Sequence, residues 1–500
     1  MFEAASLDHK VPKAVYQRQE PELRKALLDA QDELLRAKRV AVLIVIAGVD
    51  GAGKGETVNL LNDWMDPRHI EVSGFPAPTE EEAAYPRMWR FWRALPPKGK
   101  IGVFFGAWHT QPILGRVAGD LSGAEFAQRM GEILRFEKML ADEGVLLLKF
   151  WFHLSKAQQK KRMKALETNR ATRWRVTKED WRRFQRYDDF VKVSEPFLRK
   201  TSTAEAPWQV IPGVDPNYRA LTVGAQILAA LRSRLDAAPA KAKPTRARVR
   251  APAPIDNLNV LRALDLGQTL GKKDYDRALE AWQGRLNRIA RDPRFQRAAV
   301  VSVFEGNDAA GKGGAIRRVT GALDARFYRT VSVAAPSEEE RAQPYLWRFW
   351  RRIPRYGFVT IFDRSWYGRI LVERVEGYAA EPDWRRAYTE INDFEQELVR
   401  HDIVIAKFWL AIDQDEQLKR FRARQGIAFK QFKITNEDWR NRKKWPAYEA
   451  AICDMIDRTS TSIAPWTIVE ANDKRFARIK VLSTVVQAIE ARLDAIGGKD

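Results

Sequence analysis

Cysteine and long apolar runs are what this 500-residue sequence has least of. Cys453 is the single cysteine, which excludes a disulfide within the chain. No uninterrupted apolar run approaches the roughly 18 to 20 residues that a membrane helix needs. The first residues, MFEAASLDHKVPK, also lack the apolar centre of a secretory signal. We therefore expect a cytoplasmic protein with no membrane partner.

The sequence has fewer acidic than basic residues. The chain has 86 Lys and Arg against 65 Asp and Glu, which gives a formal net charge of +21. A charge of this size favours a polyanionic partner, and nucleic acid, an anionic membrane surface and an inorganic polyanion all satisfy it. The hydrophobic fraction of 45% and the aromatic fraction of 11% supply enough apolar surface for large cores, so a globular protein is expected.

The sequence contains two copies of one domain-sized segment. GVDGAGKG at 48 returns as GNDAAGKG at 306, and VTKEDWR at 176 returns as ITNEDWR at 434, both at an offset of 258 (306 − 48). WRFWR repeats at the same offset, so the copies align without a gap. The Ala-, Pro- and Arg-rich stretch between them has no hydrophobic periodicity and is typical of a linker. The predicted organisation is a first domain over 1–236, a linker over 237–256 and a second domain over 257–500.

Each copy is predicted to be an α/β domain with a parallel sheet and helices on both of its faces. VAVLIVIAG (40–48) and GVLLLKFWFHL (144–154) are continuous apolar runs in the first copy, as GFVTIFD (357–363) and DIVIAKFWLAI (402–412) are in the second. Continuous rather than alternating apolar strands are typical of sheets that are buried on both faces. Because amphipathic segments separate these strands, the pattern favours doubly wound parallel βαβ units.

A glycine-rich loop in each copy predicts a phosphate site. GNDAAGKG follows the apolar run AAVVSVFE and opens a helical segment, which is the context in which glycines let backbone N–H groups surround phosphate oxygens. The phosphate-binding candidates in this loop are Gly306, Gly311, Lys312 and Gly313. Lys54 is the counterpart of Lys312 in the first copy. The alternative is a simple glycine-rich turn in which an Asp caps the helix.

Two aspartates of the second copy are candidate metal ligands. The loop motif usually ends in a Ser or Thr that binds Mg²⁺, but Gly313 stands there, so Asp308 inside the loop can supply the oxygen instead, as Asp50 can in the first copy. Asp363 ends an apolar strand, the place where α/β sheets assemble their ligand sites. We predict that Asp308 and Asp363 hold Mg²⁺, with Mn²⁺ as an alternative, and that Arg364 neutralises phosphate oxygens. The alternative role for Asp363 is to cap a turn.

Basic segments of the second copy are further phosphate candidates. LKRFRARQGIAFKQFKITNEDWRNRKKW (418–445) is crowded with Lys and Arg and is similar to the basic lid of phosphoryl-transfer kinases; the alternative is an exposed helix that only aids solubility. In WRFWR we expect Trp347 and Trp350 to face the core rather than to stack on nucleic-acid bases. The basic candidates are Arg424, Lys430 and Lys433 in the lid, and Arg348 and Arg351 in WRFWR.

Three ordered motifs, FEGNDAAGKGG, FDRSWYGR and KQFKITNEDW, together resemble the family-2 polyphosphate kinases in a fused two-domain arrangement. The resemblance implies a P-loop kinase fold and transfer of the terminal phosphoryl group of inorganic polyphosphate to a nucleotide with Mg²⁺. Tandem members are associated with AMP as the acceptor, giving ADP. The residues that match the family's Walker A and Walker B patterns are Asp308, Lys312, Asp363 and Arg364, and the lid residues are Lys430 and Lys433.

The residue chemistry agrees with a direct in-line transfer. An acceptor phosphate is already anionic, so the site needs positive charge rather than a general base. The chain has five histidines and no evident nucleophile–base pair. Three alternatives remain open: a polyphosphate-dependent nucleoside diphosphate kinase, an ATP-dependent nucleoside monophosphate kinase, and a P-loop protein that binds nucleic acid through basic linker residues. Nucleic acid is the less favoured partner, and self-association remains open.

The first copy departs from the catalytic pattern. It keeps Asp50 and Lys54, but the strand end and the lid have lost their charged groups. Loss of a metal carboxylate and the adjacent arginine removes several kcal/mol of transition-state stabilisation, since one such group supplies roughly 3 kcal/mol. We therefore predict a nearly inactive first copy that acts as a structural partner. The replacements are Phe105 for Asp363, Gly106 for Arg364, Ala107 for Ser365, Leu166 for Arg424, Thr172 for Lys430 and Phe184 for Arg442.

Overall fold

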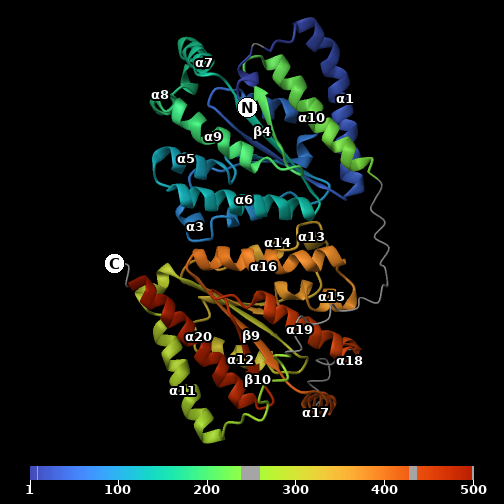
Figure 1. The fold of residues 1–500 in the computed structure, drawn as a ribbon, viewed down its shortest axis with the longest axis vertical. Helices are drawn as coiled ribbons and strands as arrows, with labels where there is room; N and C mark the ends of the chain where they lie inside the picture. Colours follow the sequence, from blue (N-terminus) through green and yellow to red (C-terminus); the bar gives the residue numbers. More distant parts are fainter. Residues whose placement is uncertain (8, 238–258, 427–435, 498–500) are drawn as a thin grey trace. The chain divides into compact units, whose positions relative to one another are not determined.

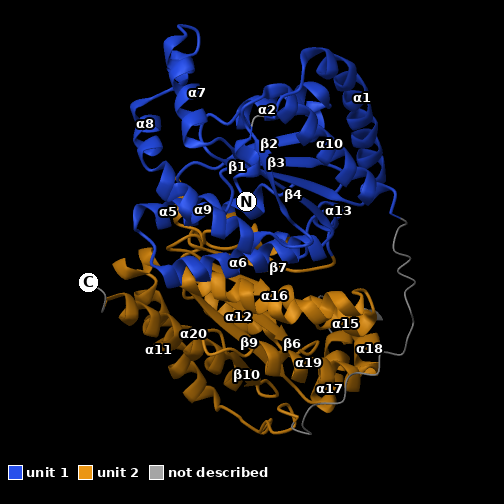
Figure 2. Cartoon of the chain, turned by 45° about the horizontal axis from the view of Figure 1, so that its top comes forward, with its two compact units in different colours: residues 1–78, 90–240, 336–347 blue, residues 79–89, 241–335, 348–500 orange. Residues whose placement is uncertain are grey.

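The computed structural model of the chain describes residues 1–7, 9–237, 259–426 and 436–497. Nearly all of the predicted linker, and the lid candidates Lys430 and Lys433, lie outside the described residues, and the predicted domain boundaries stay a prediction. Contacts divide the chain into two compact units (Figure 2). Unit 1 comprises Met1–Pro78, Arg90–Ala240 and Pro336–Trp347, and unit 2 comprises Thr79–Trp89, Lys241–Ala335 and Arg348–Asp500.

Each unit contains a five-stranded sheet in which every described pair of neighbouring strands is parallel. The order is β2-β3-β1-β4-β5 in unit 1 and, equivalently, β7-β8-β6-β9-β10 in unit 2. The predicted α/β class and parallel pairing are confirmed. The strands are β1 Ala41–Gly48, β2 Ile70–Gly74, β3 Ile101–Phe105, β4 Val145–His153, β5 Trp208–Pro212, β6 Ala299–Gly306, β7 Tyr328–Ser332, β8 Val359–Asp363, β9 Ile403–Ala411 and β10 Trp466–Glu470.

Helices cover both faces of each sheet (Figure 1). The longer helices of unit 1 are α1 Lys13–Ala37, α2 Lys54–Trp64, α5 Thr110–Ala118, α6 Gly123–Asp142, α7 Lys156–Thr168, α8 Lys178–Gln185, α9 Tyr187–Thr201 and α10 Pro216–Leu235. Those of unit 2 are α11 Lys272–Ile289, α12 Lys312–Thr320, α16 Glu381–Arg400, α17 Gln414–Gln425, α18 Asn436–Lys443, α19 Trp445–Thr459 and α20 Lys474–Gly497. Short helices are η1 Ala4–Ser6, η2 Pro67–His69, α3 Glu80–Ala83, α4 Trp89–Arg93, η3 Arg173–Arg175, η4 Pro293–Arg297, α13 Glu338–Arg341, α14 Trp347–Trp350, η5 Trp366–Arg369 and α15 Val372–Glu376. Among the described helices, none combines the length and the apolar character needed to cross a membrane.

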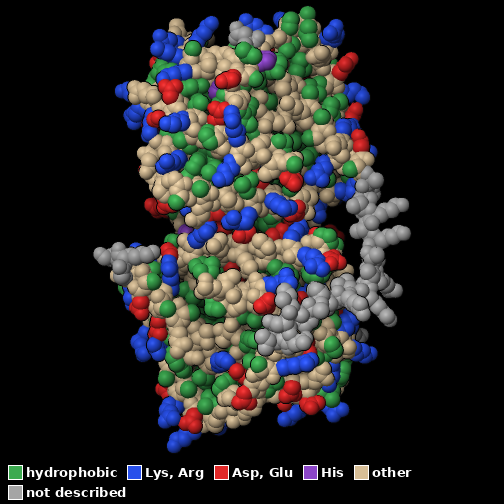
Figure 3. Space-filling model, viewed as in Figure 1, with side chains coloured by type: hydrophobic (Ala, Val, Ile, Leu, Met, Phe, Trp, Pro, Cys, Tyr) green, Lys and Arg blue, Asp and Glu red, His purple; other side chains and the backbone are tan. Residues whose placement is uncertain are grey.

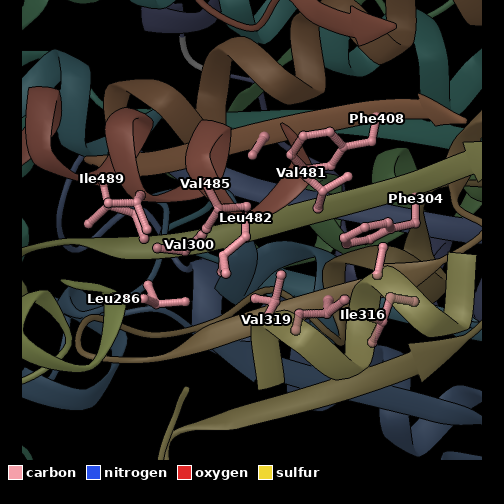
Figure 4. Packing of buried hydrophobic residues seen from close by; sticks show 14 of the residues in the cluster. Leu286, Val300, Phe304, Ile316, Val319, Phe408, Val481, Leu482, Val485 and Ile489 are labelled. Carbon is pink, nitrogen blue, oxygen red and sulfur yellow. The ribbon is translucent and has the colours of Figure 1, made fainter. Parts of the chain in front are cut away.

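The core of unit 2 forms between its sheet and the helices α11, α12 and α20. Leu286, Val319 and Val485 from these helices pack against Val300 and Phe408 from the strands, and all five side chains are buried (Figure 4). Burying an aliphatic or aromatic side chain of this size stabilises a fold by roughly 1.5 to 3 kcal/mol. Alternate residues of β9 face the opposite side of the sheet, towards α16, so the strand is buried along its whole length.

Each unit also includes a short segment of the other sequence copy. In unit 2, the segment Thr79–Trp89 supplies the Ala84 carbonyl oxygen, which accepts a hydrogen bond from the Tyr356 N–H at 3.1 Å. In unit 1, the equivalent segment supplies the Ala342 carbonyl oxygen, which accepts from the Lys98 N–H at 2.9 Å. The repeat predicted two separate domains but gave no sign of this reciprocal exchange.

Candidate active site

The glycine-rich loop of unit 2 joins β6 to α12, as the sequence predicts. Gly306 and Gly311 have φ values of 150° and 108°, a region that favours glycine. A Cβ atom on Gly306 would lie 2.5 Å from the carbonyl oxygen of Leu410, so a larger residue has no room there. Lys312 begins α12, and its Nζ donates to the carbonyl oxygen of Gly306 at 3.1 Å. This is the strand–loop–helix geometry that cradles phosphate.

Asp308 is held inside this loop by side chains from two other segments. Its Oδ2 accepts a hydrogen bond from Asn441 Nδ2 at 2.9 Å, and its Oδ1 lies 3.4 Å from an Arg364 guanidinium nitrogen. Gln417 Nε2 donates to the Asp308 carbonyl oxygen at 3.2 Å. The helix α12 begins at a Gly311 cap without a side-chain hydrogen bond, so Asp308 does not act as its cap. Its carboxylate is therefore positioned by α18 and by the end of β8.

The end of β8 brings a second carboxylate and the arginine to the loop. Asp363 is the last residue of β8, and Arg364 follows it with a φ of 64°. The hydroxyl of Ser365 accepts from the Tyr367 N–H at 3.3 Å and caps the next turn, so Asp363 is left without that role. Asp363 and Arg364 both line the cavity that Asp308 and the loop also line.

This cavity has a volume of about 670 Å³ and is strongly basic. Most of the predicted site residues line it, together with Lys and Arg side chains from α12, α17 and α20. Arg348 is close by, since it donates to the carbonyl oxygen of Ala334, a cavity residue, at 3.1 Å, whereas Arg351 is an exposed residue. Predicted residues that line the cavity are Asp308, Gly311, Lys312, Gly313, Asp363, Arg364 and Arg424, and residues that the sequence did not single out are Arg317, Arg420, Asp438, Lys474 and Arg478.

One of these cavity-lining arginines also supports the loop. Arg420 is 5% exposed, and its guanidinium donates to the carbonyl oxygens of Ala309 and Ala310 at 3.0 and 2.9 Å. It also donates to the carbonyl oxygen of Ala471 at 2.7 Å. Arg420 thus ties α17 and the end of β10 to the phosphate loop, and its charge lies directly behind the site.

Glu305 is a candidate site residue that sequence reasoning missed. It is 6% exposed, and its Oε1 accepts from the Ser365 hydroxyl at 2.9 Å. Burial raises the pKa of Glu305, while Lys312 and Ser365 act in the opposite direction. The first copy has Ala47 and Ala107 at the two equivalent positions. A comparison of the copies would have found this buried pair, because both partners disappear together.

The equivalent loop of unit 1 keeps its shape but changes its charge pattern. Lys54 Nζ donates to the carbonyl oxygen of Gly48 at 2.7 Å and lies 3.6 Å from Asp50 Oδ1. The other Asp50 oxygen lies 3.1 Å from Arg183 Nε. Burial lowers the pKa of Lys54, and Asp50 partly offsets this effect. Asp50 is therefore engaged by two cations, and Phe105 ends the strand where unit 2 has a carboxylate.

The residues that the two copies share at this strand serve packing. Phe104 and Trp108 in unit 1 are at most 1% exposed, and so are Phe362 and Trp366 in unit 2. Trp347 and Trp350 are also buried, as predicted. The sequence differences thus fall on the charged end of the strand and leave its apolar body intact.

The carboxylates of unit 2 fit a magnesium ion that is shared with a phosphate ligand. Among the described residues, no group of three or more His, Cys, Asp or Glu side chains is arranged to hold a metal by itself. Asp308 and Asp363 nevertheless line one cavity. Mg²⁺ is usually bound by one or two carboxylates together with substrate phosphates and water, which is the donor set available here.

A parallel sheet of this order, with a lysine-containing glycine loop after its central strand, defines an α/β protein of the P-loop kinase class. The sequence model of polyphosphate kinase 2 (PPK2) matches residues 10–239 and 269–495. The chain therefore belongs to the polyphosphate kinase 2 family, and each half carries one family domain.

Relatives are similar to this chain over nearly its full length. The polyphosphate:AMP phosphotransferase of Pseudomonas aeruginosa is 55% identical over 491 residues, which cover 98% of this chain and 99% of the relative. The protein of the same name from Acinetobacter johnsonii is 38% identical over 482 residues, with coverage of 95% and 97%. A crystal structure described as a polyphosphate kinase 2 from Pseudomonas aeruginosa PA01 has 53% identity and a TM-score of 0.89, and covers 99% of this chain and 100% of that chain.

Proposed function

We propose that this protein transfers the terminal phosphoryl group of inorganic polyphosphate to AMP, giving ADP, and that the transfer takes place in unit 2. The observation that carries the proposal is the basic cavity in which Asp308, Lys312, Asp363 and Arg364 come together. Family membership and the names of the full-length relatives support the donor and the acceptor.

The proposed roles follow from the chemistry of bringing two anions together. Lys312 and Arg364 offset the negative charge of the transferring phosphoryl group, and Asp308 and Asp363 are the residues that would hold Mg²⁺, with Mn²⁺ as an alternative. Such an ion, when bound, supplies further positive charge between phosphate oxygens. Asn441 keeps the Asp308 carboxylate oriented through its 2.9 Å hydrogen bond. The acceptor phosphate is already ionised, so no residue needs to remove a proton from it.

The polymer would lie along the cations around this cavity. Arg424 lines the cavity, and Arg348 contacts its wall through Ala334. Lys430, Lys433 and Arg351 are proposed as further polymer contacts, together with the loop glycines Gly306, Gly311 and Gly313. Unit 1 is proposed to be close to inactive, because Phe105 and Gly106 replace the strand-end carboxylate and the arginine.

Incubation of the protein with AMP, polyphosphate and Mg²⁺ in the absence of ATP tests the reaction. We expect ADP to form, as measured by phosphorus NMR or by chromatography. ADP that forms only when ATP is supplied would instead establish an ATP-dependent nucleoside monophosphate kinase. Phosphorylation of ADP without phosphorylation of AMP would establish the diphosphate kinase alternative.

A pair of matched variants tests the assignment to unit 2. Asp363→Asn should lower turnover by at least about 10²-fold, since single electrostatic groups of this kind supply that much. Asp50→Asn, in the equivalent loop of unit 1, should leave most of the turnover. Equal losses in the two variants would contradict the assignment, and Phe105→Asp should restore little activity to unit 1 because its arginine is also missing.

A further inference from the structure

Unit 1 contains a cavity beside its glycine-rich loop that the transfer reaction does not use. Its volume is about 540 Å³, and it lies between the loop and the helices α5, α8 and α9. Residues at the equivalent positions of unit 2, among them Gly306, Trp409 and Gln417, line a smaller cavity of about 110 Å³. The first copy therefore has the larger of the two equivalent pockets, and its size is typical of small-molecule sites, which span roughly 300 to 1,000 Å³.

The walls of the unit 1 cavity are aromatic and apolar where those of unit 2 are polar. Ala47 and Val49 replace Glu305 and Asn307, and Phe190 replaces Tyr448. The rings of Trp151 and Phe190 lie stacked, with centroids 5.7 Å apart and planes inclined by 19°. Walls of this kind favour a planar aromatic ligand.

Three buried polar atoms on cavity residues lack partners. Within the described part of the chain, His109 Nδ1, Trp151 Nε1 and Gln159 Oε1 make no hydrogen bond. The three residues are at most 4% exposed and all line the cavity. The other polar atoms of His109 and Gln159 are engaged, since His109 Nε2 lies 2.5 Å from a Glu137 oxygen and Gln159 Nε2 donates to the Asp50 carbonyl oxygen at 3.0 Å. Because buried polar atoms are normally paired, these unpaired donor and acceptor atoms favour a heteroaromatic ligand over a hydrocarbon.

The cavity also has a cationic edge suited to a phosphate group. Lys54, Arg183 and Arg186 line it together with Glu179 and with Asp50, which is paired with the first two. Glu305 and Asp363 of unit 2 have no acidic counterparts here, since Ala47 and Phe105 stand in their places. The loss of these carboxylates removes the repulsion that Mg²⁺ would otherwise have to neutralise, so an anion can bind to this edge without a metal.

We propose that the unit 1 cavity binds a nucleoside monophosphate, with the base against the wall formed by Trp151 and Phe190 and the phosphate on Lys54 and Arg183, and does not phosphorylate it. The proposal goes beyond the transfer reaction, because it assigns a second nucleotide site to the copy that lacks the catalytic carboxylate and arginine. Binding at this site is expected to be independent of Mg²⁺.

Isothermal titration of the full chain with AMP, in EDTA and without polyphosphate, tests the proposal. We expect two molecules of AMP per chain. Lys54→Gln combined with Arg183→Gln should remove one of them or weaken it at least tenfold, while Lys312→Gln should weaken the other. The proposal would be overturned if one AMP bound per chain and only Lys312→Gln weakened its binding. It would also be overturned if two AMP molecules bound and neither was weakened in the unit 1 double variant. Adenosine and inorganic phosphate, titrated separately, show whether base and phosphate both contribute.

Photolabelling of the unmodified protein with 8-azido-AMP gives a second test that needs no variant to fold. Label is expected on peptides that contain Trp151 or Phe190 as well as on peptides of unit 2. Label confined to unit 2 at saturating probe would overturn the proposal. ADP formation is assayed separately. Absence of ADP would contradict the proposed reaction and would leave the two binding results unaffected. The unit 1 double variant should keep the rate of ADP formation within about twofold of the wild type at saturating substrates.

Discussion

Arg364 holds a backbone conformation that a glycine adopts more easily. Its φ is 64°, and the equivalent Gly106 has a φ of 67°. In this left-handed region, a residue with a Cβ is less favourable by roughly 1 to 2 kcal/mol. Arginine stands in the copy that has both carboxylates, and glycine stands in the copy that lacks the strand-end carboxylate, which indicates that the guanidinium in unit 2 serves function rather than stability.

Substitution of Arg364 should therefore separate stability from activity. Arg364→Gly should be more stable than Arg364→Ala by about 1 kcal/mol, because only the alanine keeps the backbone strain. Both variants should lose about 10²- to 10³-fold in the rate of ADP formation. Urea unfolding and initial rates are the measurements, and equal free energies of unfolding for the two variants would contradict the strain argument.

Glu305 should make the stability of unit 2 depend on pH. Burial raises the pKa of Glu305 above its ordinary value of 4.5, so the folded protein holds this proton more tightly than the unfolded chain does. The stabilisation from this group is complete below about pH 4.5 and is lost as the pH rises through the raised pKa. Glu305→Gln keeps an acceptor for the Ser365 hydroxyl and cannot ionise. Its urea midpoint should match that of the wild type at low pH and exceed it at pH 8, and a constant difference across the range would exclude this linkage.

At the scale of elements, a buried ion pair joins β9 to α16 near the end of β8, where Asp363 and Arg364 lie. Lys407 Nζ lies 2.7 Å from Glu395 Oε2, and the two side chains are at most 1% exposed. The Tyr367 hydroxyl and Trp366 Nε1, which follow β8, donate to the other Glu395 oxygen at 2.6 and 3.1 Å. The pair therefore helps to attach the turn after β8, which follows Asp363 and Arg364, to α16. Unit 1 keeps an equivalent pair, in which Lys149 Nζ lies 2.6 Å from Glu137 Oε2.

Replacement of the lysine alone should destabilise the fold more than replacement of both charged side chains by neutral ones. Lys407→Met leaves the Glu395 charge buried and unpaired, which should lower the free energy of unfolding by about 3 to 5 kcal/mol. Adding Glu395→Gln to Lys407→Met should recover a large part of that loss, because glutamine still accepts from Tyr367 and Trp366. Denaturant titration of both variants is the measurement. A double variant as unstable as the single one would argue that packing of the lysine, rather than charge, is what matters.

For the molecule as a whole, the positive charge of +21 is its most general property. Lys and Arg side chains lie over the visible faces of both units (Figure 3). A long polyphosphate carries about one charge per phosphate and, like nucleic acid, releases counterions when it binds. The excess charge thus has a direct explanation in the proposed donor.

The Michaelis constant for long polyphosphate should rise with salt. Between 50 and 200 mM NaCl we expect an increase of about tenfold or more, if several phosphates are neutralised. The Michaelis constant for AMP, which carries a single phosphate, serves as the control and should change much less. A Michaelis constant for polyphosphate that stays flat over this range would contradict the electrostatic account.

The sequence by itself determined the repeat, the α/β class, the glycine-rich loops and the contrast between the strand ends of the two copies. These are local patterns: a buried strand needs a continuous apolar run, and a phosphate loop needs glycines at fixed spacing. The edge strands β2 and β7 escaped prediction because their side chains are largely exposed and their short runs are interrupted by charged or polar residues.

Only the tertiary structure decided which distant residues meet. The Glu305–Ser365 and Asp308–Asn441 hydrogen bonds join positions 60 and 133 residues apart. The exchanged segments and the larger cavity of unit 1 likewise depend on contacts between elements far apart in the chain. The physical reason is that local patterns fix backbone conformation, whereas partners of buried polar groups are fixed by how sheet and helices pack.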